Sequence, residues 1–128
     1  VARFGNGDAL VYNRGYGRPR SYSLPLRPDF SWERGGRLDV VLDAKFRLKW
    51  SVAEEEPESP AATATRDDLY KMHTYRDALR VRAAVAVYRG DRNRFFDVTH
   101  GPREDLDLKA LLTGAGSGVG ALARRPGM

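Results

Sequence analysis

The sequence contains no cysteine and only two histidines, which narrows the metal chemistry open to it. Disulfides and thiolate metal sites are excluded, and two histidines leave little for a structural zinc site. A catalytic metal would be held mainly by oxygen, which points to Mg²⁺ or Mn²⁺. No apolar run approaches the roughly 20 residues that a bilayer requires, and no signal-peptide pattern opens the chain. We therefore expect a cytoplasmic protein with no membrane contact.

The chain is long enough for one domain with a modest core. It has 128 residues, of which 41% are hydrophobic, and its formal net charge is +5. Nearly all of the 22 basic residues are arginine, whose planar fork suits phosphate and favours a polyanionic partner. A GC-rich genome, whose base composition favours arginine codons over lysine codons, would explain the arginine preference equally well. The chain begins at Val1 rather than Met and soon enters strand-like sequence, which favours a domain of a longer protein.

The first half of the sequence predicts three strands. Two strand-like stretches cover 8–17 and 21–33, and the glycines of "RGG" at 34–36 indicate a hairpin turn. The third stretch, "RLDVVLDAKFRL" at 37–48, is followed by an acidic, proline-containing loop over 51–65.

The second half begins with a helix. Thr65 is a suitable N-cap, and apolar residues recur at helical spacing through "DDLYKMHTYRDALR". A buried strand at 83–90, a further strand at 94–101 and a short helix at 103–113 follow. The sequence thus predicts an α/β domain over 1–113, with a mixed central sheet flanked by helices, and a flexible glycine-rich tail over 114–128.

The strand at 37–48 carries charge where burial is expected. Strict alternation puts its even positions, from Leu38 to Leu48, on a core face, and puts Asp39, Asp43 and Lys45 on a face that is either solvent or a site. In a suitable hairpin register, Asp29 would reach the same face as Asp43. Two adjacent carboxylates repel unless a cation compensates, and Mg²⁺ would do so. Lys45 could then orient or deprotonate a metal-bound water.

These residues resemble a known motif. Asp29 in "RPD" and "DAK" at 43–45 are similar to the PD-(D/E)xK nuclease motif, and the order of strands and helix resembles the restriction-endonuclease-like core. The segment "DLYKMHTY" resembles the helix that follows the motif in McrC-like defence-associated nucleases. Lys71 and Tyr75 match the Q-x-x-x-Y element of RecB-like nucleases, with lysine where glutamine is commoner. The resemblance covers about residues 8 to 98.

The resemblance implies a Mg²⁺-dependent (or Mn²⁺-dependent) deoxyribonuclease domain within a larger restriction or anti-phage defence protein. Asp29, Asp43 and the backbone carbonyl of Ala44 would bind the metal, and Lys45 would activate the water. Lys71 and Tyr75 would support the site. DNA is the expected substrate, RNA remains open, and a homodimer would suit symmetric cutting of a duplex. The arginines expected to hold phosphates are Arg27, Arg47 and Arg76.

Several residues keep a second interpretation. Asp29 follows a proline and is alternatively a turn residue, and Asp43 with Lys45 is alternatively a solvated face. Tyr75 is equally well explained as packed core. For Asp39, an ion pair with an arginine is favoured over metal binding.

The sequence departs from the family pattern at one point that bears on catalytic activity. Many members carry a further acidic residue on a helix before the first strand, and this sequence has no such helix. Either that residue precedes Val1, or Glu33 or another carboxylate replaces it. The alternative function is a catalytically inactive nuclease-fold module that binds nucleic acid or serves in assembly.

Overall fold

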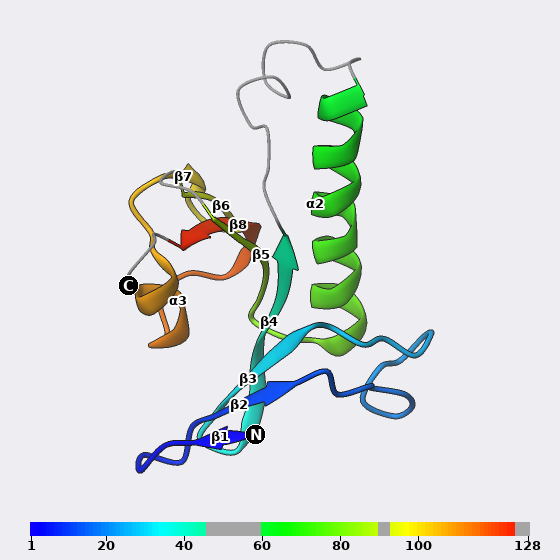
Figure 1. The fold of residues 1–128 in the computed structure, drawn as a ribbon, viewed down its shortest axis with the longest axis vertical. Helices are drawn as coiled ribbons and strands as arrows, with labels where there is room; N and C mark the ends of the chain where they lie inside the picture. The colour runs from blue at the N-terminus through cyan, green and yellow to red at the C-terminus, as the bar shows by residue number, and fades with distance from the viewer. Residues whose placement is uncertain (46–59, 90–92, 125–128) are drawn as a thin grey trace.

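The computed structural model describes residues 1–45, 60–89 and 93–124 (Figure 1). For Lys45, Arg124 and residues 60–66 the description covers the backbone alone. Within these ranges eight strands form one mixed sheet in the order β1-β2-β3-β4-β5-β8-β6-β7. The elements are β1 (Ala2–Arg3), β2 (Ala9–Tyr12), β3 (Phe30–Arg34), β4 (Arg37–Lys45), α2 (Pro60–Leu79), β5 (Ala83–Arg89), β6 (Arg94–Asp97), β7 (Gly101–Arg103), α3 (Leu108–Leu112) and β8 (Gly118–Arg124). The expected α/β class with a mixed central sheet is confirmed.

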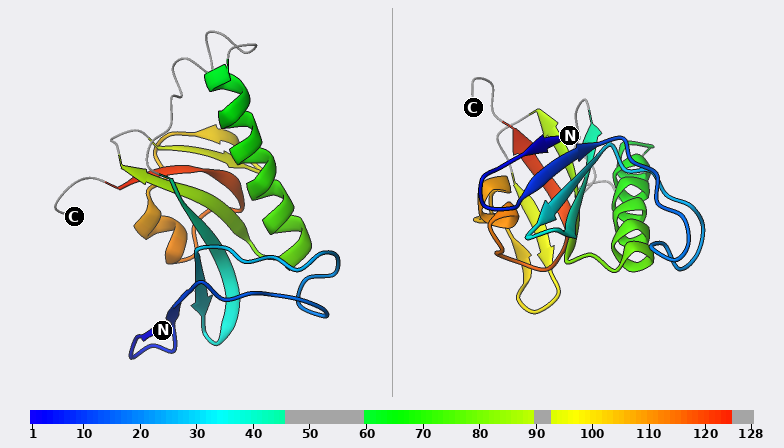
Figure 2. Two further views of the ribbon diagram at one scale, coloured as in Figure 1. Left: turned by 45° about the vertical axis from the view of Figure 1, so that its right-hand side comes forward. Right: turned by 90° about the horizontal axis from the view of Figure 1, so that it is seen from below.

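The sheet combines an antiparallel meander with a parallel centre. Strands β1 to β4 pair antiparallel in chain order, whereas β4, β5 and β8 run parallel. The chain crosses from β4 to β5 through α2, as parallel neighbours require. Figure 2 shows α2 on one face of the sheet and α3 on the other. No helix in the described ranges combines the length and the apolar character needed to cross a bilayer.

Both faces of the central strands are buried. Beneath α3, the buried cluster includes Val40, Leu42, Val85, Phe95, Leu111 and Leu122. Beneath α2, it includes Val41, Met72, Tyr75, Leu79, Ala84 and Val119. Strands covered on both faces read as nearly continuous apolar runs, which explains "AAVAVYR" in β5. The odd-numbered face of β4, expected to be solvent or a site, is therefore largely core.

A β-bulge changes the phase of β4. The β3–β4 register moves from Trp32 opposite Val40 to Glu33 opposite Leu38, so Asp39 is the extra residue. Leu38 consequently packs with the α2-side cluster, not with Val40. The expectation of strict alternation along 37–48 is wrong at this point, because a bulge shifts every side chain before it to the other face.

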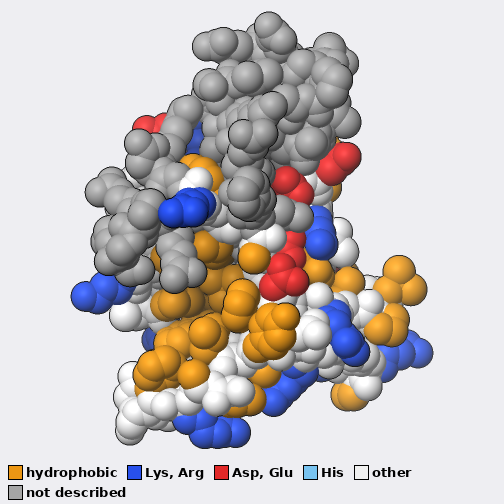
Figure 3. Space-filling view, viewed as in Figure 1, with side chains coloured by type: hydrophobic (Ala, Val, Ile, Leu, Met, Phe, Trp, Pro, Cys, Tyr) orange, Lys and Arg blue, Asp and Glu red, His pale blue; other side chains and the backbone are white. Residues whose placement is uncertain are grey.

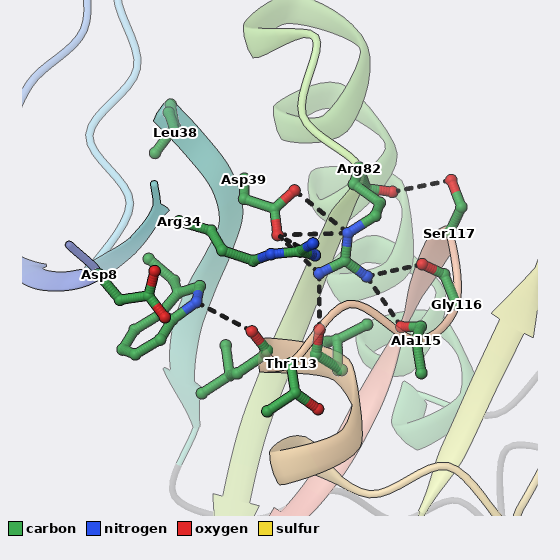
Figure 4. A network of polar contacts seen from close by, with 12 residues as sticks. Asp8, Arg34, Leu38, Asp39, Arg82, Thr113, Ala115, Gly116 and Ser117 are labelled. Carbon is green, nitrogen blue, oxygen red and sulfur yellow. Dashed lines mark hydrogen bonds and ion pairs between the residues drawn. The ribbon is translucent and has the colours of Figure 1, made fainter. Parts of the chain in front are cut away.

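Asp39 is bound by an arginine, as the sequence favoured. Arg82 donates from Nη2 to Asp39 Oδ2 at 2.7 Å and from Nε to Oδ1 at 3.1 Å (Figure 4). The same guanidinium donates to the carbonyl oxygens of Leu111, Ala115 and Gly116 at 2.6 to 2.8 Å. One side chain therefore joins β4, the start of β5, the end of α3 and the approach to β8.

Two predicted boundaries differ from the structure. The helix begins at Pro60, so Thr65 lies inside α2 and is not its N-cap. Proline is well suited to the first helical position, and the alanines that follow are strong helix formers. The expected loop over 51–65 is therefore helical from residue 60 onward, and its remainder lies outside the described residues. The strand expected over 21–33 begins only at Phe30 and ends at Arg34. The prolines before it have no backbone N–H to donate to a neighbouring strand.

The glycine-rich end over 114–128 was expected to be flexible, and this is wrong for residues 118–124. Gly118–Arg124 forms β8, which lies between β5 and β6. Glycine is needed there because β6 comes close: a Cβ on Gly120 would lie 2.3 Å from the Arg94 carbonyl oxygen. The boundary expected at residue 113 therefore does not divide an ordered domain from a tail.

Gly120→Ala should destabilise the protein because the added methyl group meets the β6 backbone, which has no flexible end to move aside. Overpacking of this kind costs about 2 to 3 kcal/mol of unfolding free energy. Urea denaturation followed by circular dichroism measures it. Gly5→Ala is the matched control, since nothing lies within 4 Å of its Cβ position, and equal stability of the two variants would contradict the close approach.

Arg82→Ala should lower the unfolding free energy by about 2 to 4 kcal/mol, since it leaves the half-buried Asp39 carboxylate without its bidentate partner. Arg14→Ala removes an exposed arginine paired with Glu33 at 3.3 Å and should cost under about 1 kcal/mol. The same denaturation measurement compares them. A loss for Arg82→Ala no larger than that for Arg14→Ala would show that the network adds nothing to stability.

Candidate active site

The β3–β4 hairpin places two carboxylates on neighbouring strands. Phe30 pairs with Leu42, so Asp29, just before β3, lies across from Asp43. The backbone N–H of Ala44 donates to Asp29 Oδ2 at 2.8 Å, which fixes that carboxylate beside the residue that follows Asp43. Asp29 is thus not only a turn residue: its side chain crosses to β4. The register that would bring the two carboxylates together is the one observed.

Asp43 is buried and paired with a cation. Only 3% of the residue is exposed, and Lys71 of α2 places Nζ 3.3 Å from Asp43 Oδ2. Burying a carboxylate is costly unless a partner compensates its charge. The alternative of a solvated face is therefore wrong for Asp43. Lys71 lies within α2 where the helix crosses this strand, and its side chain remains about half exposed (46%).

Tyr75 packs in the core and also contacts Lys71, the partner of Asp43. It is 5% exposed and packs with Val41 and Met72, while the Lys71 ammonium lies 5.6 Å from the centre of its ring. Burial raises the pKa of Tyr75 above its ordinary value, and the charge of Lys71 partly opposes this shift. The negative charges of Asp43 and Asp29 raise the pKa further. The two interpretations of Tyr75 are therefore compatible.

Four residues expected at the site are not brought next to Asp29 and Asp43 by the described structure, or are described only in part. Lys45 pairs with Tyr88 in the β4–β5 register, but its side chain lies outside the described part. Arg47 also lies outside the described residues. Arg27 is exposed, with its guanidinium over Gly15. Arg76 donates to the Arg82 carbonyl oxygen at 3.1 Å and to Ser117 Oγ at 3.2 Å, so it holds the starts of β5 and β8 together.

Glu33 is not a nearby third carboxylate. It lies four residues beyond Asp29 on β3, which is about 13 Å along a strand, and it pairs with Arg14. Across the described ranges, no three His, Asp or Glu side chains form a group that could hold a metal ion. The two carboxylates next to the Ala44 backbone are nevertheless oxygen donors of the kind that Mg²⁺ and Mn²⁺ prefer.

The direct contact of Lys71 with Asp43 was not predicted from the residues themselves. A signal was present, because Lys71 adjoins Met72 and precedes Tyr75 by one helical turn, so it borders the stripe that packs on the sheet. A lysine at the edge of a buried stripe can reach a carboxylate under the helix. Only the distance between α2 and β4, which the sequence does not contain, decides whether it does.

Residues 4–93 match the family model of the PD-(D/E)XK nuclease superfamily. The matched region includes Asp29, the "DAK" segment and α2, and it ends before β6. No curated protein and no solved structure matches the chain. Because the family match covers well over half of the sequence, the chain belongs to the PD-(D/E)XK nuclease superfamily.

Lys71→Ala should lower the unfolding free energy by about 1 to 2 kcal/mol, because it removes a hydrogen bond to the buried, charged Asp43 carboxylate. The loss is moderate because the Lys71 side chain is half exposed, and solvent weakens its ion pair. Lys71→Gln keeps a donor and should lose less. Thermal denaturation of both variants measures this. Lys109→Ala, on the exposed side of α3, is the control, and a Lys71→Ala protein as stable as this control would argue against the ion pair.

Proposed function

We propose that this domain is a metal-dependent nuclease that hydrolyses the phosphodiester bonds of DNA. The observation that carries the proposal is the position of Asp29 across from the buried Asp43, with the Ala44 backbone held between them. Carboxylates are rarely buried in a sheet without a functional or structural need. Membership of a nuclease superfamily supports a nucleic acid as the substrate.

Asp29, Asp43 and the carbonyl oxygen of Ala44 would hold Mg²⁺ or Mn²⁺. The metal would supply charge neutralisation at the phosphate and lower the pKa of a bound water. Lys71 already places a positive charge at Asp43, which is consistent with a site that takes a cation. When the metal binds, the Lys71 ammonium would be free to turn toward Tyr75 or the substrate.

The protein's own groups would carry the proton transfer and the orientation of the water. Lys45 follows Asp43 by two residues in the sequence, as the lysine does in the PD-(D/E)xK motif that the "DAK" segment resembles. In its neutral form it would accept a proton from the attacking water. The water oxygen bonds to phosphorus, the bond from phosphorus to the leaving sugar oxygen breaks, and that oxygen takes a proton from solvent. Tyr75 would position Lys71 beneath the substrate.

The wider setting follows from the "DLYKMHTY" segment, which resembles McrC-like and RecB-like helices. On that basis the domain would act within a larger restriction or anti-phage defence protein in the cytoplasm, with sequence recognition supplied elsewhere. Cleavage of both strands would suit a homodimer.

An inactive nucleic-acid-binding or assembly module is the second candidate. It is favoured by one observation: within the described ranges no third carboxylate accompanies Asp29 and Asp43, and Glu33 is engaged by Arg14. An incomplete ligand set would weaken metal binding while leaving the fold intact.

The cleavage of supercoiled plasmid in the presence of Mg²⁺ or Mn²⁺ tests the proposal. We expect wild-type protein to nick it, chelator to abolish nicking, and Asp43→Asn or Lys45→Ala to lower the rate by about 100-fold or more. Asp105→Asn, an exposed carboxylate remote from the site, is the control. If wild type and Lys45→Ala cleave equally, the catalytic assignment is wrong.

Direct titration of Mn²⁺ by calorimetry should show a site in wild type that Asp43→Asn weakens at least tenfold. Loss of a charged ligand costs more than about 1.4 kcal/mol of binding free energy, which is tenfold in affinity. Binding of DNA with neither cleavage nor Mn²⁺ binding would favour the inactive module.

A further inference from the structure

The segment that joins β2 to β3 concentrates the positive charge of the chain. Residues 13–28, here called the arginine arm, contain four arginines and no acidic residue, lysine or histidine. The arm therefore carries +4, against +5 for the whole chain. All four are exposed: Arg14, Arg18, Arg20 and Arg27.

The arm is docked on the body of the protein. Its two sides pair through Tyr16 and Leu26, whose backbones exchange hydrogen bonds at 2.6 and 2.8 Å. Farther along, Ser21 is fully buried and its hydroxyl donates to the Leu24 carbonyl oxygen at 2.6 Å. These contacts hold the backbone that presents the arginines.

A tyrosine fastens the arm to the last turn of α2. The backbone N–H of Tyr22 donates to the Ala78 carbonyl oxygen at 3.2 Å, and its hydroxyl donates to Asp77. The Arg80 guanidinium lies over the Tyr22 ring, 5.3 Å from its centre. Arg80 is itself exposed, so the contact adds a fifth arginine to the same surface.

The arm begins and ends at the candidate site. The N–H of Asn13, its first residue, donates to the Asp29 carbonyl oxygen at 2.8 Å. In Figures 1 and 2 the arm extends from this point past the lower end of α2, on the α2 side of the sheet. The space-filling view shows blue side chains over that lower right region, below the acidic atoms beside α2 (Figure 3).

We propose that the arginine arm, together with Arg80, is the docking surface for duplex DNA, whose phosphates it holds next to Asp29 and Asp43. This inference rests on the proposed nuclease function. Guanidinium groups bind phosphate through paired N–H donors, and such contacts position a duplex without reading its sequence.

Duplex rather than single-stranded nucleic acid is favoured by the state of the arm's aromatic rings. Proteins that bind single strands stack bases on exposed rings. Tyr16 is half-buried and packs against the α2-side cluster. Tyr22 is 42% exposed, but Arg80 lies over its ring and its hydroxyl is bonded to Asp77. The arm thus exposes positive charge, whereas its two tyrosine rings make the contacts that attach it to the rest of the protein.

Binding to a 20-base-pair duplex, measured by fluorescence anisotropy in chelator across a range of salt concentrations, tests the inference without any cleavage. The arm variant is Arg18→Gln with Arg20→Gln, which keeps Tyr22 and its contacts and removes one hydrogen bond of 3.4 Å from Arg20 to the Leu38 carbonyl oxygen. Its matched control is Arg3→Gln with Arg37→Gln, which removes the same charge from exposed positions in β1 and at the start of β4. Equal thermal melting of the two proteins establishes that both are folded.

We expect the arm variant to bind at least tenfold more weakly at about 100 mM salt and to reduce the slope of log K against log salt by about 2, since each phosphate contact contributes about 0.9. The control should stay within about twofold of wild type, because its charges are not at the interface. Equal effects in the two variants, no duplex binding by wild type, or tighter binding of single-stranded DNA or RNA that the arm variant leaves intact would each overturn the inference.

The Asp43→Asn variant distinguishes failure of the proposed nuclease function from failure of the arginine-arm inference. Asp43→Asn should bind the duplex at least as well as wild type, because it removes a negative charge near the phosphates. If the arm variant loses binding while Asp43→Asn still cleaves plasmid, the arm is the docking surface and the catalytic assignment is wrong.

Discussion

The bulge at Asp39 is the constraint on which the arrangement of β4 depends. Without the extra residue, Asp39 and Asp43 would lie on one face and both carboxylates would need compensation beneath α2. With it, Asp39 turns to the α3 side, where Arg82 binds it, and Asp43 remains on the α2 side with Lys71. Asp39 is thus bound within the architecture, and Asp43 is the proposed metal ligand. The bulge and the Arg82 network support each other, because the guanidinium also ties the ends of α3 and the approach to β8 to this strand.

A buried carboxylate is costly, and that of Asp43 is paired with a lysine whose side chain is half exposed. Asp43 lies in the layer between the sheet and α2, where the surrounding side chains are apolar and charge is poorly solvated. The Lys71 ammonium lowers that cost, and in the proposed metal site its half-exposed side chain would move aside for the ion. Asp29 approaches from the neighbouring strand and is held by a backbone N–H rather than by a second charge.

The sequence predicted those parts of the fold in which local pattern and tertiary environment agree. The strand at 83–90 and the packed stripe of Met72 and Leu79 follow from apolar periodicity, and the position of Asp29 near Asp43 follows from the hairpin turn between their strands. The errors arise where a distant partner overrides local preference. Glycines in β8 have low strand propensity, yet they are required because β6 passes too close for a Cβ. Arg76 was expected to hold a phosphate near the groove, and only the position of Ser117 reveals that it also bonds within the fold.

The distribution of charge links the arginine arm to the carboxylates. In the proposed complex, a phosphodiester at Asp29 and Asp43 would meet repulsion from two negative groups, and a divalent ion would cancel their charge without adding attraction along the rest of the duplex. Screening limits the reach of any one charge to about 8 Å at physiological salt, so attraction must come from cations along the path of the DNA backbone. The arginine arm would supply them beside the candidate site, since Asn13 is hydrogen-bonded to Asp29 and Tyr22 to α2. The same contacts that order the arm set the position of its arginines relative to the two carboxylates.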